Sequence, residues 1–189
     1  DEVDDRLPIE LDGLAGWYLG ERMLSARLTG ADPADLRAAE WRRGTLPPAG
    51  LGGAVLDEVE RTVETLVRAA RNDYRLPPRA VDIAVDLGAG RRITGTVPEV
   101  HGDVLVRTTY SRVSAKHRLG AWVALLALAA GDDTGERSWR AVITGRGRFG
   151  RPAWRCELTA PAAPQAREIL RDLTALRDLG LTQPLPIVT

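Results

Sequence analysis

Apolar residues recur at helical spacing through the first 75 positions, which predicts helices and no strand in this part of the chain. Helices are predicted over about 13–28, 33–43 and 54–71, and the segment "TLPPAGLGG" (45–53) is expected to be a loop. Apolar side chains share one face of each of the two longer helices. The residues on the first of these faces are Leu14, Trp17, Leu24 and Leu28, and those on the second are Val55, Val59, Leu66 and Ala70.

The first two predicted helices carry residues typical of helix ends. Asp12 and Asp32 stand where an N-cap side chain accepts backbone N–H groups. Pro33 occupies a first helical position, which suits its fixed φ angle. Gly30 and Gly44 follow where each helix should end, because glycine readily adopts the left-handed conformation of a C-cap.

From residue 81 the apolar pattern changes to a period of two. Every second residue of 81–87 is apolar, which predicts a half-buried strand. The sequence "GAG" (88–90) then predicts a hairpin turn, and a second strand is expected over 92–97. A third strand is expected over 103–110, after a turn that includes His101. This part of the chain is therefore predicted to be a three-stranded meander.

One further helix and two further strands are predicted before a closing helix. Ser114 suits the N-cap of a helix over 115–130 that is nearly all apolar, so this helix is expected to be buried on most sides. Strands are predicted over 138–145 and 152–158, on either side of a turn rich in glycine and arginine. An amphipathic helix should begin near residue 163 and stop at Gly180.

The order of these elements predicts an α/β fold with a mixed sheet flanked by helices and an all-helical N-terminal segment. The predicted division is a helical segment over 1–75 that packs on an α/β core over 76–189. The chain has the character of a fragment of a larger subunit.

Composition narrows the function classes. The 26 basic residues balance 26 acidic ones among 189 residues, so only local clusters of charge can indicate nucleic-acid binding. Cys156 is the lone cysteine, which excludes an internal disulfide and favours a reducing, cytoplasmic compartment. The longest apolar run, 121–130, is too short to span a bilayer, so no membrane partner is expected.

Four stretches of the chain resemble the C-terminal part of the gamma subunit (RecC) of exodeoxyribonuclease V. They are "LDGLAGWYLGERMLSARLTGADP", "GTLPPAGLG", "ITGTVPEVHGDVLVRTTYSRVSAKHRLGAWVALLALAA" and "LRDLGLTQPLPI". This family belongs to the RecBCD-type helicase–nuclease of bacterial recombination repair. The resemblance implies beta and alpha subunits and single-stranded DNA as partners, in the bacterial cytoplasm. It also implies that ATP and Mg²⁺ are used by the partner subunits and that this domain has no cofactor of its own.

The resemblance further implies a nuclease-like fold of the PD-(D/E)XK type that lacks its chemistry. Active domains of this type hold Mg²⁺ with an aspartate on one strand and an Asp-x-Lys pattern on the next. Pro98 stands at the first aspartate position, and Thr108 and Tyr110 replace the second aspartate and the lysine. Proline offers no side-chain ligand, and a threonine hydroxyl and an uncharged tyrosine are poor substitutes. No catalytic residue and no metal site are therefore expected.

Two alternatives remain open from the residues alone. An active Mg²⁺-dependent nuclease could use displaced acids, for which Glu99 and Asp103 are the candidates. A pure protein-interaction module would need no contact with DNA.

Nucleic-acid contacts are predicted from two arginine-rich stretches, "RTTYSRVSAKHR" (107–118) and "GRGRFGR" (145–151). Arginine can hold phosphate, and Tyr110 of the first stretch could stack on a base. In the second stretch, three arginines and an aromatic residue on a flexible turn could grip a strand of nucleic acid. The alternatives are a solvated basic edge or a protein interface for the first stretch, and an ordinary hairpin loop for the second. The candidate nucleic-acid-binding residues are Arg107, Arg112, Lys116, Arg118, Arg146, Arg148 and Arg151.

Overall fold

The computed structural model describes residues 11–132 and 134–184, and within these ranges the chain forms helices and a five-stranded sheet of order β1-β2-β3-β4-β5. In chain order the elements are α1 (Gly13–Leu28), α2 (Pro33–Arg42), α3 (Ala49–Ala70), β1 (Arg79–Gly88), β2 (Arg91–His101), β3 (Val104–Arg112), α4 (Ala115–Ala130), β4 (Arg140–Arg146), β5 (Ala153–Thr159) and α5 (Ala163–Thr182). The predicted order of elements is confirmed.

The chain folds into two compact units, which are described separately. Of the described residues, the helical unit contains 11–74, 108–113 and 144–155. The sheet unit contains 75–107, 114–132, 134–143 and 156–184. The strands β3, β4 and β5 each contribute residues to both units.

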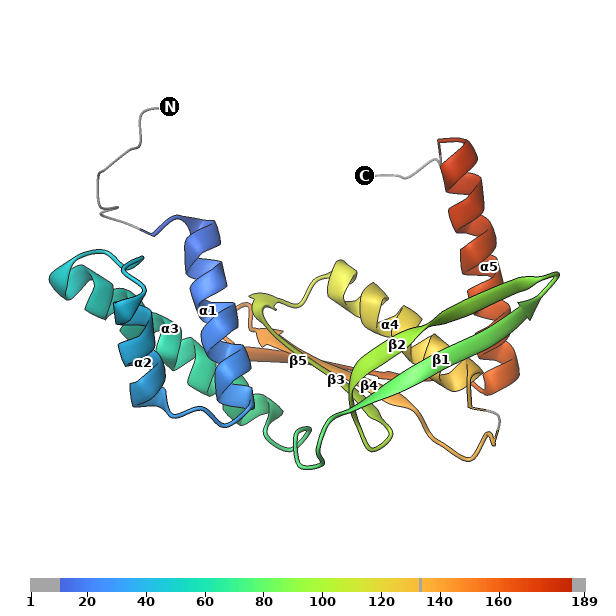
Figure 1. Cartoon of the computed structure of the whole chain (residues 1–189), viewed down its shortest axis with the longest axis horizontal. Helices are drawn as coiled ribbons and strands as arrows, with labels where there is room; N and C mark the ends of the chain where they lie inside the picture. The colour runs from blue at the N-terminus through green and yellow to red at the C-terminus, as the bar shows by residue number, and fades with distance from the viewer. Residues whose placement is uncertain (1–10, 133, 185–189) are drawn as a thin grey trace. The chain divides into compact units, whose positions relative to one another are not determined.

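In the helical unit, α1 packs against α2 and α3 (Figure 1). The predicted caps are present, since the Asp12 carboxylate accepts the backbone N–H groups of Leu14 and Ala15 at 2.8 and 2.7 Å, and Asp32 caps α2 in the same way. One face of α1 and one face of α3 are buried, with Leu46 and Tyr110, in a single apolar cluster, which stabilises the unit. Its buried members are Leu19, Met23, Leu24, Leu46, Leu56, Val59, Val63, Leu66 and Tyr110.

The start of α3 corrects the sequence prediction. The helix begins at Ala49, five residues before the predicted start, so the glycine-rich end of the expected loop is helical. Pro48 precedes it in an extended conformation. A β-carbon at Gly52 would collide with the carbonyl of Pro47 and lie 2.7 Å from the ring of Trp41. The glycines that suggested a loop therefore include one that lets a turn of helix approach its neighbours closely.

In the sheet unit, β1 and β2 form the predicted antiparallel hairpin. The buried residues of β1 are Ile83, Val85 and Leu87, which confirms the predicted alternation. β2 pairs with β3 in the antiparallel sense. β4 lies parallel to β3, because the Arg140 N–H donates to the Asp103 carbonyl at 3.1 Å and Gly145 lies against Ser111. The sheet is therefore mixed, as predicted.

β2 extends four residues beyond its predicted end because it contains a bulge. Pro98 and Glu99 lie opposite the single residue Ala80 of β1, and Glu99 has a φ of 59°. The residues on either side, Val97 and Val100, are both buried. A bulge accommodates a residue that cannot donate a ladder hydrogen bond, which explains how proline occurs within this strand.

Two expectations about the later helices need correction. Residues 125–130 at the end of α4 are buried as predicted, but nearer its start Leu119 is 58% and Val123 is 40% exposed. α5 passes through Gly180 and ends at Thr182, because Gln183 precedes a proline and takes the extended conformation that this position favours.

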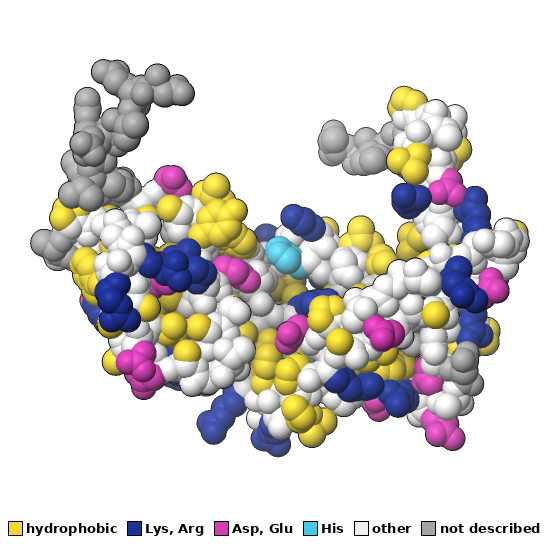
Figure 2. All heavy atoms as spheres, viewed as in Figure 1, with side chains coloured by type: hydrophobic (Ala, Val, Ile, Leu, Met, Phe, Trp, Pro, Cys, Tyr) yellow, Lys and Arg dark blue, Asp and Glu magenta, His cyan; other side chains and the backbone are white. Residues whose placement is uncertain are grey.

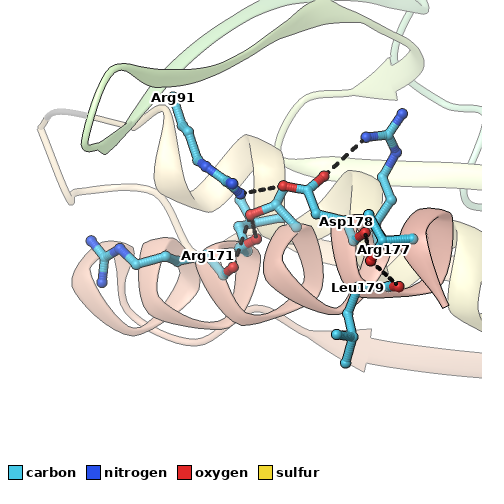
Figure 3. A network of polar contacts seen from close by, with 8 residues as sticks. Arg91, Arg171, Arg177, Asp178 and Leu179 are labelled. Carbon is cyan, nitrogen blue, oxygen red and sulfur yellow. Dashed lines mark hydrogen bonds and ion pairs between the residues drawn. The ribbon is translucent and has the colours of Figure 1, made fainter. Parts of the chain in front are cut away.

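α5 is attached to the hairpin of β1 and β2 by polar contacts (Figure 3). Arg171 Nε donates to the Leu87 carbonyl at 3.0 Å, and the Asp178 carboxylate forms an ion pair with Arg91 at 2.6 Å. α4 packs against α5 and against β1, so these helices cover the hairpin in the sheet unit. Among the helices described here, none has both the length and the apolar character required to cross a membrane.

Candidate functional site

One face of α1 contacts the stretch of β3 that includes Thr108 and Tyr110, two of the positions where a nuclease residue is expected to be replaced. Trp17 Nε1 donates to Ser111 Oγ at 2.8 Å. One turn further along the helix, Glu21 Oε2 accepts the Tyr110 backbone N–H at 2.8 Å and the Thr109 hydroxyl at 3.3 Å. Residues four apart lie on the same face of a helix, so both contacts come from a single stripe of α1.

Gly20 lies on the same face, and because it has no side chain it leaves room for the ring of Tyr110. A β-carbon at this position would collide with three carbon atoms of that ring. On the ring, the Arg146 guanidinium lies 4.8 Å from the centroid, within the range of a cation–π contact. The tyrosine ring thus packs against a helix backbone and against a cation.

Tyr110 is only 6% exposed. Burial raises the pKa of its phenol, while a hydrogen bond with Thr62 and the charge of Arg146 lower the pKa by smaller amounts. The phenol is therefore neutral at physiological pH, as the sequence predicted. Because the ring is covered, Tyr110 is not available in this structure to stack on a base.

Thr108 and Pro98, the other two positions where a nuclease residue is expected to be replaced, have different surroundings. Thr108, which is half-buried, accepts a hydrogen bond from the Tyr74 hydroxyl at 3.2 Å. Pro98 is exposed in the bulge of β2 and belongs to the sheet unit, whereas Thr108 and Tyr110 belong to the helical unit. The side chains of Thr108 and Tyr110 are thus already engaged in hydrogen bonds and packing within the helical unit.

The two displaced acids lie near one end of the β2–β3 hairpin. Glu99 Oε2 is 3.7 Å from Nε2 of His101, and Nδ1 of that histidine lies 2.6 Å from the Leu76 carbonyl. His101 was expected in a turn but is the last residue of β2 and is buried. Asp103 is exposed in the turn. Across residues 11–132 and 134–184, no three His, Cys, Asp or Glu side chains lie together as a metal site would require.

Four of the predicted nucleic-acid-binding residues belong to the helical unit. Arg112 is exposed at the end of β3, and Arg148 and Arg151 are exposed in the turn between β4 and β5. Arg146 is half-buried on Tyr110, so part of its surface is already used in packing.

The remaining three predicted residues belong to the sheet unit. Lys116 and Arg118 are exposed in the first turn of α4, and Arg107 is half-buried in β3. At this helix start the Ser114 N–H donates to His117 Nδ1 at 3.2 Å, so one free backbone donor is already satisfied. The cations of the first arginine-rich stretch are thus divided between the two units, whereas those of the second stretch all belong to the helical unit.

Charge is mixed on one face of the molecule. On the face shown in Figure 2, basic and acidic side chains are interspersed rather than gathered by sign. This agrees with the balanced composition and means that any contact with DNA must rely on a local group of cations.

Sequence reasoning missed Glu21, the carboxylate that binds the backbone of β3. Its spacing from Trp17 places both on one helix face, but nothing in the sequence says that β3 lies against that face. Replacing Glu21 with alanine leaves the Tyr110 N–H without its side-chain acceptor, so we expect a loss of about 1–3 kcal/mol of stability.

Glu21→Gln retains an acceptor oxygen and should cost less than Glu21→Ala. Urea unfolding, with hydrogen exchange at the Tyr110 amide, measures the difference. Equal losses for the two variants would show that the hydrogen bond to β3 is not what Glu21 contributes.

Comparison with known proteins agrees with the resemblance. Residues 1–189 match the family model described as the RecC C-terminal domain. The chain is 43% identical over 185 residues to the RecBCD enzyme subunit RecC of Mycolicibacterium smegmatis, which covers 98% of this chain and 17% of that protein. It is 41% identical over 187 residues to the subunit of the same name from Mycobacterium tuberculosis, covering 99% and 17%. The chain thus spans about a sixth of the length of these relatives, and it belongs to the RecC C-terminal domain family.

Proposed function

We propose that this chain is a non-catalytic, nuclease-like domain of an exodeoxyribonuclease V gamma subunit. Its role is to support subunit assembly and to guide separated DNA strands during double-strand break repair by homologous recombination. Membership of the RecC family carries this proposal, since the relatives are named as subunits of the RecBCD enzyme.

The fold supports the comparison with a PD-(D/E)XK nuclease. Three antiparallel strands are followed by α4 and by β4, which lies parallel to β3. In an active domain, β2 and β3 would carry the acids and the lysine. Here a proline and two hydrogen-bonded or buried side chains stand at those positions, none of them suited to a divalent cation. Mg²⁺ and ATP then belong to the beta and alpha subunits, and the location is the bacterial cytoplasm.

The active-nuclease alternative is tested by a Mg²⁺-dependent cleavage assay on single-stranded and double-stranded DNA. With a nuclease-inactive beta subunit in the complex, we expect no cleavage. Cleavage that disappears in Glu99→Ala or Asp103→Ala would overturn the non-catalytic assignment.

Contact with DNA is proposed at the turn between β4 and β5, where Arg148 and Arg151 are exposed. Arg148→Ala and Arg151→Ala should each weaken single-strand binding by the full-length subunit. Each lost phosphate contact should reduce the slope of log K against log salt by about 0.7. Arg68→Ala, an exposed arginine of α3, is the matched control and should leave the slope unchanged. Unchanged slopes in both turn variants would favour a pure protein-interaction module.

A further inference from the structure

The chain between β4 and β5 forms a tight turn whose backbone conformation is unfavourable for one of the residues at its centre. The Arg151 N–H donates to the Arg148 carbonyl at 3.1 Å, which closes a four-residue turn. The two central residues, Phe149 and Gly150, have φ angles of 53° and 76°. Positive φ at both central positions defines a type I′ turn, where asparagine, aspartate and glycine are preferred.

Phe149 is strained and contributes little to the packing of the chain. Its left-handed backbone is uncommon for a bulky side chain, and its side chain is 98% exposed. Folding therefore gains almost nothing from the ring, while the backbone conformation costs stability. A strained residue that offers an apolar ring to solvent indicates a role in binding something outside the chain.

The neighbours of Phe149 indicate what that ligand is. Arg148 and Arg151 flank it and are exposed, and the Arg151 guanidinium lies 5.8 Å from the ring centroid of Trp154, which is itself 43% exposed. Aromatic rings between arginines are suited to a polyanion that also has flat, apolar faces. Single-stranded nucleic acid has both, because every base can stack and every linkage carries a phosphate.

We propose that Phe149 stacks on an unpaired base of single-stranded DNA, with Arg148 and Arg151 holding the phosphates on either side. This inference rests on the proposed function, because it assumes that the turn contacts DNA. It assigns to Phe149 the stacking role that the sequence suggested for Tyr110, whose ring is buried.

Photocrosslinking tests the contact within the full-length subunit in its assembled complex, where other parts also bind DNA. A single strand substituted with 5-iododeoxyuridine crosslinks to an aromatic ring on which the halogenated base is stacked. We expect a crosslinked peptide that contains Phe149. The crosslink should disappear in Phe149→Asn and persist in Phe149→Trp, while Tyr18, which is 52% exposed in the same unit, should not be crosslinked.

Stability separates a binding role from a folding role. Phe149→Asn places a favoured residue in the turn, so its melting temperature should equal or exceed that of the parent protein. Binding at this turn should nevertheless fall by about 5- to 150-fold, the range for losing one stacked base. A lower melting temperature with an unchanged crosslink yield would mean that Phe149 serves folding, and the inference would be wrong.

The outcomes also separate this inference from the proposed function. If the Arg148 and Arg151 variants lose salt-dependent binding but Phe149→Asn binds normally, the stacking role is excluded and the proposed DNA contact stands. If the parent protein gives no crosslink and Phe149→Asn instead weakens subunit assembly, the ring binds protein and the inference is overturned. If the turn arginines have no effect either, both proposals fail.

Discussion

Replacing Gly20 with alanine is expected to destabilise the helical unit by about 1–3 kcal/mol, the usual cost of overpacking a filled core. The same substitution in an exposed helix interior would stabilise it by up to about 1 kcal/mol, because alanine is the better helix former. Here the added methyl group collides with the ring of Tyr110. The ring has little room to move, since it is buried and the Arg146 guanidinium lies on it.

A double-mutant cycle with Tyr110→Ala should abolish or reverse the loss of stability caused by Gly20→Ala. In a Tyr110→Ala background the collision is absent, so Gly20→Ala should be neutral or stabilising. Urea unfolding of the four proteins measures the coupling between the two positions. If Gly20→Ala destabilises both backgrounds equally, the ring does not pack on α1 as described.

The second large effect is expected at Leu56, which is fully buried in the apolar cluster of the helical unit. Leu56→Ala removes three buried carbon atoms and leaves a cavity, so we expect a loss of about 2–5 kcal/mol. Hydrogen exchange of the α1 and α3 amides in the parent and variant proteins measures the loss of stability within the helical unit.

Leu51→Ala is the matched control for Leu56→Ala, because the two leucines lie on the same helix and Leu51 is 53% exposed. A change at an exposed site away from special contacts is usually within about 0.5 kcal/mol. Comparable losses for the two variants would contradict the described orientation of α3.

The substitutions at Gly20, Glu21 and Leu56 bear on function because all three residues support the same stretch of β3. Gly20 and Glu21 contact Tyr110 directly, and Leu56 belongs to the cluster that includes this residue. Under the proposed function, the strand that would carry the second aspartate and the lysine of a nuclease is instead part of a packed core. These substitutions should therefore change stability and assembly rather than any chemical step.

The sequence by itself determined the elements whose signals are local. The bounds of α1 follow from an aspartate cap and from apolar spacing within a few residues, and the alternation of β1 follows from adjacent positions. The arginine-rich turn follows from a run of consecutive residues. The family resemblance, not the residue pattern, assigns Pro98, Thr108 and Tyr110 to the positions of the nuclease acids and lysine. That none of the three carries a carboxylate or ammonium group is evident from the residue types alone.

Only the tertiary structure decided the features that depend on residues distant in the sequence. The bulge at Pro98 is defined by pairing with β1, and the exposure of Leu119 depends on which elements cover α4. Tyr110 is buried because α1 presents a glycine to it, and Phe149 became the stacking candidate because its ring is almost fully exposed. Periodicity records which side of an element is apolar, whereas burial depends on the partner that reaches that side.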